Sequence, residues 1–392
     1  MYSYLSHLEC TGCFRKLSAD EPQNLCRQCG KVLYARYDLK AAAASLSKDE
    51  LAGRPSTMWR YHELLPVQGL AFLTTLGEGF TPLLKAERLG NQLGCPNLYI
   101  KDEAGNPTGS FKDRGLSAAV SRAVELGLTR LGIPSAGNAA GSMAAYCSRA
   151  GLEAHVVLPD TTPRANVEEC RAYGAKLAFG PGSIAEAGRE LRRLAAKRGL
   201  FDVSTLGEPY RLEGKKTLGF EVAEQLGWRL PDVIVYPMGG GTGLLGMWKA
   251  FEEMEELGWL GGDRPRMVSV QAAGCAPIVK AFHQGASSAE PCQNPKTLAA
   301  GLRVPSPLGD YLILQVIRES GGTALDVADE EMLACVKEMA ASEGIFPCPE
   351  GAATLAGLKK LVDQGMVSAA ETILLVNTGS GMKYLDVLRE PF

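Results

Sequence analysis

The residue best suited to covalent chemistry in this sequence is a lysine at the start of a predicted helix. Lys112 lies in the stretch KDEAGNPTGSFKDRG (residues 101–115), where Gly, Pro, Asn and Ser give way to a helical pattern. Ser110 and Asp113 are spaced as in a capping box, which places Lys112 in the first helical turn. The helix dipole disfavours an ammonium there by roughly 0.3 to 1 kcal/mol. The amine is therefore expected to deprotonate more easily and to condense with a carbonyl; a solvated surface lysine is the other interpretation.

A glycine-rich turn is the second chemical feature. In VIVYPMGGGTGLLGMWKAF (residues 233–251) a buried-strand pattern runs into glycines, and a helix pattern follows at once. Consecutive backbone N–H groups at a helix start can surround a phosphate. The pattern G-x-G-x-x-G also occurs here, but the next strand ends at Gln271 without the acidic residue of a dinucleotide site. A tight turn without a ligand is the third interpretation. The residues of the predicted phosphate site are Gly239, Gly240, Gly241, Thr242 and Gly243.

Two more turns link a predicted strand to small residues. Ser135 and Asn138 lie in PSAGNAAGSMAAYCSRAG, where free helix amides would favour an anion or simply be capped. Thr378 ends a strand ahead of a Gly-Ser-Gly turn, and its hydroxyl could bond a ligand atom or cap the turn. A phosphate site, a reactive amine preceded by Phe111 and a hydroxyl for a ring nitrogen together describe a pyridoxal phosphate site.

The N-terminal cysteines form a separate predicted site. Four of the eleven cysteines follow the pattern C-x2-C-x12-C-x2-C, which is typical of two knuckles that hold a tetrahedral zinc ion. A closed four-thiolate site leaves no position for substrate, so the zinc is expected to be structural. A ribbon folded without metal and a redox dithiol are the alternatives. The predicted ligands are Cys10, Cys13, Cys26 and Cys29.

Composition limits the function classes. The 392 residues are 46% hydrophobic and 22% charged, with a formal net charge of −3. These values are typical of a globular protein, and they give no reason to expect nucleic acid or a membrane as a partner. The first residues have no secretory pattern and no apolar run is long enough to span a bilayer, which predicts a cytoplasmic protein.

The elements that must position these residues alternate along the chain. Short β-like runs are predicted at 97–102, 131–136, 154–159, 175–180, 232–238, 266–271 and 372–378. Helical patterns lie between them, and most end on glycine as helix C-termini do. This alternation predicts parallel sheets covered by helices.

The ordered motifs resemble a known family. LGEGFTPL (76–83), KDEAGNPTGSFKDRG, SAGNAAGSMAAYCSRAG, YRLEGKKTLGFEV (210–222), PMGGGTG and NTGSGMK occur in the order found in the tryptophan-synthase-β-like, fold-type II pyridoxal phosphate enzymes. The resemblance covers nearly the whole chain, and the four-cysteine ribbon is similar to an extension in some members. It implies two doubly wound open-sheet α/β domains and a small zinc-ribbon-like segment. The implied ranges are 1–35 for the ribbon, 36–117 with 212–392 for the large cofactor domain, and 118–211 for the small domain.

The resemblance also implies roles for single residues. Lys112 would bind the cofactor covalently beside Phe111, Asn138 would bond the ring's 3′ oxygen, and Thr378 would face the pyridine nitrogen. The amides of residues 239–243 would hold the cofactor phosphate. The loop that would hold the substrate carboxylate consists of Ser135, Ala136, Gly137, Asn138 and Ala139.

The implied reaction is the conversion of O-phospho-L-homoserine and water to L-threonine and phosphate. Arg211, with Thr205 nearby, would bind the substrate's phosphate, because a guanidinium matches two phosphate oxygens. Ala139 stands where the family commonly has threonine, which leaves a cysteate synthase or a hydroxy-amino-acid dehydratase as alternatives. An NAD(P)-dependent oxidoreductase is the alternative from another class. The expected partners are a small amino-acid substrate and a second copy of the chain in a homodimer.

Overall fold

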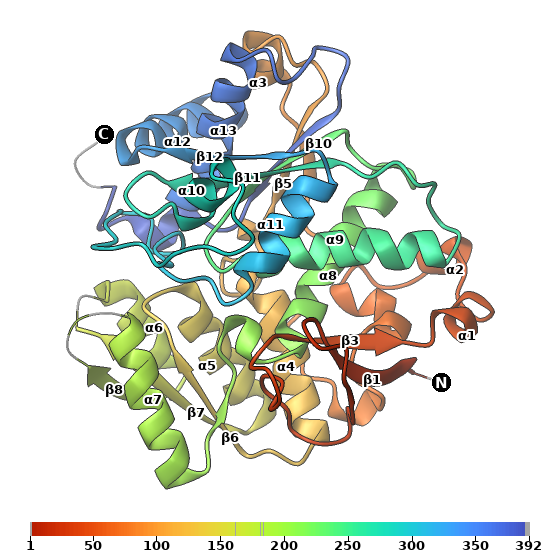
Figure 1. The fold of residues 1–392 in the computed structure, drawn as a ribbon, viewed down its shortest axis with the longest axis vertical. Coiled ribbons are helices and arrows are strands. Elements are labelled where there is room, and N and C mark those ends of the chain that lie inside the picture. The colour runs from red at the N-terminus through yellow and green to blue at the C-terminus, as the bar shows by residue number, and fades with distance from the viewer. Residues whose placement is uncertain (1, 161, 181, 183, 389–392) are drawn as a thin grey trace. The chain divides into compact units, whose positions relative to one another are not determined.

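The computed structural model describes residues 2–160, 162–180, 182 and 184–388 (Figure 1). The chain divides into two compact units. Unit 1 comprises residues 1–80, 112–219 and 249–259, and unit 2 comprises residues 81–111, 220–248 and 260–392. The domain ranges expected from the sequence stay a prediction. They also include positions 1, 161, 181, 183 and 389–392, which lie outside the described residues.

Unit 2 is built on a six-stranded sheet in the order β12-β11-β10-β13-β5-β4. All neighbouring strands are parallel except β4, which pairs antiparallel with β5 at the sheet's edge. Strands β10 and β13 are buried along their whole length, as expected for central strands covered on both faces. The strands are Leu83–Lys85 (β4), Leu98–Asp102 (β5), Val233–Pro237 (β10), Arg266–Ala272 (β11), Thr323–Val327 (β12) and Ile373–Asn377 (β13).

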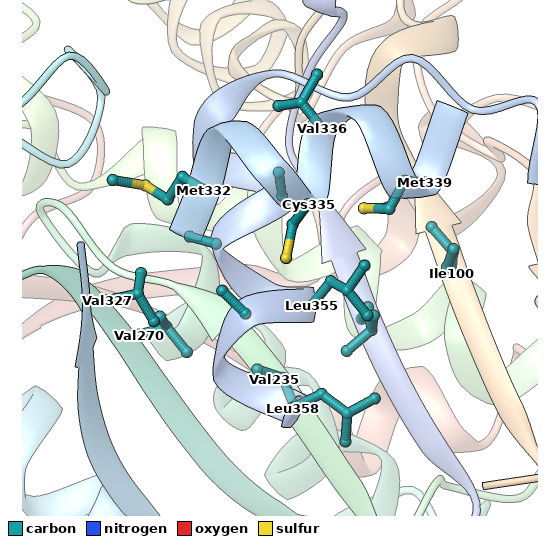
Figure 2. Packing of buried hydrophobic residues seen from close by; sticks show 14 of the residues in the cluster. Ile100, Val235, Val270, Val327, Met332, Cys335, Val336, Met339, Leu355 and Leu358 are labelled. Carbon is teal, nitrogen blue, oxygen red and sulfur yellow. The ribbon is translucent and has the colours of Figure 1, made fainter. Parts of the chain in front are cut away.

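Helices α12 and α13 cover one face of this sheet (Figure 2). Met332 and Cys335 of α12 and Leu355 of α13 pack with Val235 and Val270 of the central strands in one apolar cluster. The helices of unit 2 are Glu87–Gln92 (α3), Pro277–His283 (α10), Asp310–Glu319 (α11), Asp329–Glu343 (α12) and Pro349–Asp363 (α13). Tyr210–Gln225 (α8) and Thr242–Glu256 (α9) include residues of both units.

Unit 1 contains a four-stranded parallel sheet in the order β8-β7-β6-β9. Val156 of β7 packs with α4 and α5, whereas the next residue, Val157, packs with α7. Helices therefore cover both faces of this sheet as well. Its elements are Lys112–Glu125 (α4), Arg130–Pro134 (β6), Asn138–Ala150 (α5), Glu153–Pro159 (β7), Arg164–Ala172 (α6), Lys176–Gly180 (β8), Ile184–Arg198 (α7) and Phe201–Asp202 (β9).

A small antiparallel sheet, β2-β1-β3, opens unit 1 and carries the four clustered cysteines. We call residues 5–37 the ribbon. Its strands are Leu5–Cys10 (β1), Lys16–Leu17 (β2) and Leu33–Tyr37 (β3), followed by Leu39–Ala43 (α1) and Lys48–Ala52 (α2). Leu8, Cys10, Cys26 and Tyr37 pack with Tyr210 of α8 in one apolar cluster. The ribbon is thus joined to the rest of unit 1 through α8.

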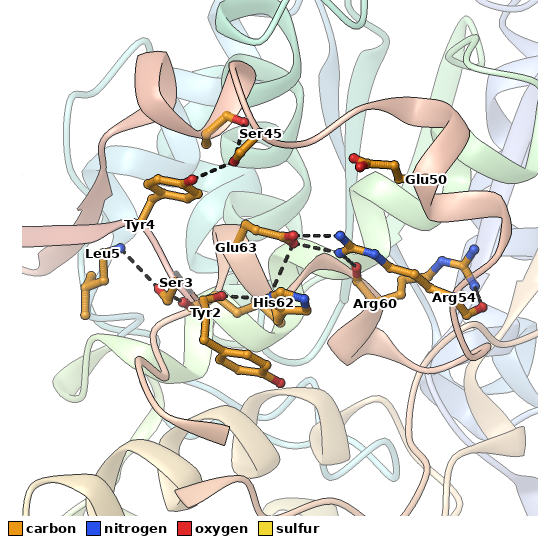
Figure 3. A network of polar contacts seen from close by, with 12 residues as sticks. Tyr2, Ser3, Tyr4, Leu5, Ser45, Glu50, Arg54, Arg60, His62 and Glu63 are labelled. Carbon is orange, nitrogen blue, oxygen red and sulfur yellow. Dashed lines mark hydrogen bonds and ion pairs between the residues drawn. The ribbon is translucent and has the colours of Figure 1, made fainter. Parts of the chain in front are cut away.

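A polar network fastens the residues that precede the ribbon (Figure 3). The carboxylate of Glu63 accepts two hydrogen bonds from the Arg54 guanidinium, at 2.7 and 2.6 Å. His62 Nδ1 lies 2.6 Å from the Tyr2 carbonyl oxygen, and the two rings stack with centroids 4.2 Å apart. Burial, with the Glu63 charge adding, raises the pKa of the Tyr2 phenol to about 12. The network is structural, because it holds the chain start against the short helix Met58–Leu64.

The seven predicted strands all form, each within two residues of the expected limits. In the part of the chain that the structure describes, no helix is long and apolar enough to span a membrane.

Candidate active site

The glycine-rich turn of unit 2 connects the central strand β10 to helix α9. It is aligned with the sheet by the Met238 backbone N–H, which donates to the Val270 carbonyl oxygen at 2.7 Å. Gly241 has φ +78°, a conformation that favours glycine, and a Cβ there would stand 2.3 Å from Ile313 Cδ1. Only a glycine therefore fits at the last position before the helix.

Two other glycines of this turn are also fixed by close contacts. A Cβ at Gly239 would stand 2.2 Å from the Gly301 carbonyl oxygen, and one at Gly243 would stand 1.7 Å from the Tyr236 hydroxyl oxygen. The absence of side chains leaves the backbone N–H groups at the start of α9 accessible to a ligand, and the helix dipole favours an anion there. These residues fit the phosphate of pyridoxal phosphate.

Glu350 supports the segment that packs on the turn. Its Oε1 accepts the Gly301 N–H at 2.7 Å and the Tyr384 hydroxyl at 2.8 Å. Because the Gly301 carbonyl lies against Gly239, the Glu350 carboxylate fixes one wall of the turn.

Phe111 and Thr378 lie side by side in unit 2. The Phe111 N–H donates to the Thr378 carbonyl oxygen at 3.0 Å, and Ser110 forms a β-bridge with Gly379. The Thr378 hydroxyl lies 3.6 Å from the Cys348 sulfur. Burial raises the pKa of the Cys348 thiol well above its usual range, so Cys348 stays protonated. The pair thus offers a neutral hydroxyl, which suits a pyridine nitrogen that is not protonated.

Lys112 is the first residue of α4 and opens the second segment of unit 1, residues 112–219. Its neighbour Asp113 is buried and accepts a 2.6 Å hydrogen bond from the Ser142 hydroxyl of α5. The starts of α4 and α5 are therefore tied together, which places Lys112 near the loop that precedes α5.

That loop carries the residues predicted to hold the substrate carboxylate. Ser135 follows β6, its N–H donates to the Val157 carbonyl at 3.1 Å, and its hydroxyl accepts the Gly137 N–H at 3.3 Å. The Asn166 amide donates to the Ala136 carbonyl at 3.0 Å. Asn138 begins α5 and Ala139 is buried behind it. The loop is therefore a fixed turn at the carboxyl end of a parallel sheet, where ligands of open α/β sheets bind.

Arg211, predicted to bind the substrate's phosphate, is buried near the start of α8. Its Nη1 donates to the Val203 carbonyl at 2.8 Å, and among the described residues no acceptor meets its buried Nε. Burial lowers the pKa of Arg211 to about 10, against the opposing charges of Glu208 and Asp202, so the guanidinium stays charged at neutral pH. The predicted partner Thr205 is exposed at the start of the turn Thr205–Gly207, in which Leu206 is buried.

Glu208 anchors that end of α8. Its two carboxylate oxygens accept the backbone N–H groups of Tyr210 at 3.0 Å and Arg211 at 2.8 Å. Burial raises the pKa of Glu208 to about 7, although these hydrogen bonds and Arg211 oppose the shift. The negative charge beside Arg211 is therefore only partly present at neutral pH.

Lys215 adds a further buried basic side chain to this part of unit 1. Burial, with the charges of Arg211 and then Lys112 adding, lowers its pKa well below the usual range. A Cβ at Gly115 would stand 2.5 Å from Lys215 Nζ. Together with Arg114, four basic side chains surround one region where the acidic groups Asp113 and Glu208 are already hydrogen-bonded. The charged Arg211 guanidinium suits a phosphate dianion, whose charge would also favour protonation of Lys215.

The cysteine cluster has the geometry of a metal site. The four sulfur atoms of Cys10, Cys13, Cys26 and Cys29 all lie within 4.8 Å of one another. Cys10 and Cys29 are 3.3 Å apart and Cys13 and Cys26 are 3.7 Å apart, near the ~3.8 Å expected between sulfurs around a tetrahedral zinc ion. The donor set is compatible with a structural metal.

The sequence analysis missed Glu208, Lys215 and Asn24. Lys215 follows Arg211 by four residues, so the spacing of one helix face could have revealed it. Glu208 caps α8 from two residues before its start, but glutamate is not among the usual capping residues, so its type did not mark it. Asn24 contacts a segment 178 residues away, and nothing local marks it.

Comparisons with known proteins agree with this geometry. The family described as pyridoxal-phosphate-dependent enzymes matches residues 74–379. A threonine synthase from Methanosarcina acetivorans is 39% identical over 390 residues, covering 98% of this chain and 95% of that protein. A threonine synthase from Methanocaldococcus jannaschii is 38% identical over 378 residues, covering 96% of this chain and 93% of that protein.

Solved structures share the fold. Maize serine racemase superposes with a TM-score of 0.67 at 22% identity, over 79% of this chain and 92% of that one. Threonine deaminase isoform 2 from Solanum lycopersicum superposes with a TM-score of 0.64 at 23% identity, over 79% of this chain and 87% of that one. The predicted α/β fold is confirmed, and the family match favours the phosphate interpretation of the glycine turn over the dinucleotide one. The chain therefore belongs to the family of pyridoxal-phosphate-dependent enzymes.

Proposed function

We propose that this chain is a threonine synthase, a lyase that converts O-phospho-L-homoserine and water to L-threonine and inorganic phosphate. The observation that carries the proposal is the buried, charged guanidinium of Arg211 in unit 1, whose Nε meets no acceptor among the described residues. A phosphate oxygen would satisfy that buried donor, which otherwise costs about 1 to 3 kcal/mol. The relatives at 38–39% identity over nearly their whole length, which are named threonine synthases, support the same substrate.

The residues that the family resemblance assigns to pyridoxal phosphate would hold it as follows. The backbone of residues 239–243 would bind its phosphate, Phe111 would border its ring, Asn138 would bond the 3′ oxygen, and Thr378 would face the ring nitrogen. Pyridoxal phosphate, when bound, supplies an electron sink for the carbanions that form as protons leave the substrate. Lys112 binds the cofactor and then moves the proton, first from Cα and next from Cβ. The position of Lys112 at the positive end of α4 favours the neutral amine that proton removal requires.

The substrate is held at both of its charged ends. The loop of residues 135–139 binds the carboxylate through backbone N–H groups at the start of α5. Arg211 binds the phosphate through its Nε, which meets no acceptor among the described residues; Lys215 lies near Arg211, and Thr205 is the further contact that the family resemblance implies. Phosphate leaves from Cγ and water adds at Cβ, so the atoms balance as threonine plus phosphate.

Three further properties belong to this proposal. The four cysteines bind one structural zinc ion, as their spacing and sulfur positions support. The enzyme works as a homodimer, and it does so in the cytoplasm.

The test is an assay of the purified enzyme, loaded with pyridoxal phosphate, on four substrates in separate reactions. O-phospho-L-homoserine is expected to yield threonine and phosphate in equal amounts, while phosphoserine, serine and threonine yield little phosphate or ammonia. Phosphate without threonine, or turnover of serine or threonine alone, would overturn the proposal. Borohydride reduction followed by peptide mass spectrometry should place the label on Lys112, and a label on Lys215 would contradict the assigned role.

A further inference from the structure

One side chain of the ribbon holds both ends of a turn in the main body of unit 1. The Asn24 amide nitrogen donates to the Asp202 carbonyl at 2.8 Å and to the Gly207 carbonyl at 2.9 Å. Asn24 lies between the two cysteine knuckles, two residues before Cys26. A single amide thus uses both of its hydrogens to close residues 202–207 onto the ribbon.

The turn that Asn24 closes contains the groups that orient Arg211. Val203 provides the carbonyl that accepts Arg211 Nη1 at 2.8 Å. Asp202 contributes an opposing charge to Arg211, and its own carboxylate is fixed by the Ser204 N–H at 2.8 Å. A shift of the turn would therefore move the acceptor that sets the direction of the guanidinium.

A second contact joins the ribbon to the residue next to Arg211. The Ala19 carbonyl accepts the Tyr210 hydroxyl at 3.2 Å and Arg122 Nη2 at 2.8 Å. The Tyr210 ring belongs to the apolar cluster of the ribbon, and the Arg122 guanidinium lies 5.7 Å from its centroid. The ribbon thus holds the chain on both sides of Glu208, which anchors α8.

We infer that the ribbon positions the phosphate-binding arginine, with Asn24 as the positioning residue that fixes the Val203 carbonyl and hence the Arg211 guanidinium. The inference rests on the proposed function for the identity of the anion, but the contacts that carry it are independent of it. Asn24 touches neither substrate nor cofactor and acts through residues 202–207. The ribbon, which has no open metal position for catalysis, then has a role in substrate affinity.

The test compares two variants of Asn24 with a matched control on the same ribbon. Asn24→Ala removes both hydrogen bonds. Asn24→Asp keeps the shape of the side chain, but it replaces the donating amide group with a carboxylate oxygen that faces the two carbonyl oxygens as an acceptor. Gln28→Ala removes an exposed amide side chain between the last two cysteines. In the full-length holoenzyme, we expect Asn24→Ala to raise KM for O-phospho-L-homoserine and Ki for inorganic phosphate roughly tenfold, with kcat within about twofold. Asn24→Asp should raise both KM and Ki by more than Asn24→Ala does, and Gln28→Ala should leave both constants at their wild-type values.

Hydrogen–deuterium exchange gives a readout that does not depend on the substrate. Peptides covering residues 202–211 should exchange faster in Asn24→Ala and not in Gln28→Ala, while cofactor absorbance and metal content stay unchanged. Unchanged exchange with an unchanged Ki for phosphate would overturn the inference. A loss of kcat equal to the rise in KM would also overturn it, because a general structural defect would act on both. If the wild type fails to convert O-phospho-L-homoserine, the proposed function fails, while phosphate binding measured by calorimetry and the exchange data still decide the role of Asn24.

Discussion

Gly115 of α4 lies so close to Lys215 of α8 that a Cβ at position 115 would stand 2.5 Å from the lysine Nζ and 2.7 Å from the Arg211 carbonyl oxygen. The contact is reciprocal, since a Cβ at Gly214 would stand 1.9 Å from the Arg114 carbonyl oxygen. The two helices therefore cross at paired glycines. This close crossing sets the position of the first turn of α4, with Lys112, relative to the first turn of α8, with Arg211.

Gly115→Ala is expected to destabilise the protein by about 1 to 3 kcal/mol, because the backbone carbonyl of Arg211 cannot move aside cheaply. The direction of the change in unfolding free energy is informative, because replacing glycine with alanine in an open helix interior stabilises a protein by up to about 1 kcal/mol. Urea unfolding of the holoenzyme measures the difference. Gly262→Ala is the control, because a Cβ there meets nothing within 4 Å and its φ is not in the left-handed region. Equal midpoints for both variants would contradict the close crossing.

Glu208→Gln is expected to change how stability depends on pH. The pKa of Glu208 is raised to about 7 in the folded state, above its unfolded value near 4.5. The folded state therefore binds the proton more tightly, and the stability that this provides is fully present below pH 4.5 and lost as pH rises through 7. Glutamine cannot lose a proton, so the variant should gain stability relative to wild type between pH 5 and 8.

Urea unfolding at pH 5, 6, 7 and 8 tests this expectation. Glu168→Gln serves as a control, because Glu168 is an exposed partner of Arg171 and should leave the pH profile unchanged. A constant difference between Glu208→Gln and wild type across this range would show that Glu208 does not titrate there.

Arg211→Lys is expected to weaken substrate binding more than turnover. Lysine keeps the charge but loses the planar fork and the hydrogen bond to the Val203 carbonyl. Each lost charge-assisted hydrogen bond is worth about 1.5 to 3 kcal/mol, so KM for O-phospho-L-homoserine should rise roughly 10- to 100-fold. Steady-state phosphate release measures KM and kcat, with cofactor absorbance as the check on the intact site. An unchanged KM would remove Arg211 from the phosphate site.

The strands were predictable where apolar residues run uninterrupted and a glycine or proline follows. VIVYP and ILLVN are such runs, and they form the buried strands β10 and β13. Strand β12, TALDV, escaped prediction because Asp326 interrupts its apolar pattern, and β9 is only two residues long. Burial of a strand depends on the sheet around it, which a local pattern does not contain.

In the candidate site, too, residues marked by local sequence could be predicted and residues that depend on distant contacts could not. Lys112 and the glycines of residues 239–243 could be singled out from the sequence because they lie in local turns at helix starts, and their roles stay predictions. The contacts of Asn24 and the buried state of Lys215 arise only when distant segments pack, so residue type and spacing could not reveal them.

A buried group of charges at Tyr37 supports the last prediction. Lys216 and Lys249 each pair with both Glu213 and Glu253, at 2.5 to 2.9 Å, and the two lysine Nζ atoms lie 4.0 and 5.0 Å from the Tyr37 ring centroid. Two positive and two negative side chains balance one another. The group links the last strand of the ribbon to α8 and α9.

Glu253→Gln leaves this buried group with one uncompensated positive charge, and we expect it to cost about 3 to 5 kcal/mol of unfolding free energy. The double variant Lys249→Met/Glu253→Gln removes one charge of each sign and keeps the Glu213–Lys216 pair, so it should be more stable than the single Glu253→Gln variant. A double-mutant cycle by urea unfolding should give a coupling of about 2 kcal/mol or more. The exposed pair Glu190–Arg193 is the matched control, with an expected coupling below about 1 kcal/mol. Equal couplings at the two pairs would mean that water reaches the charges beside Tyr37.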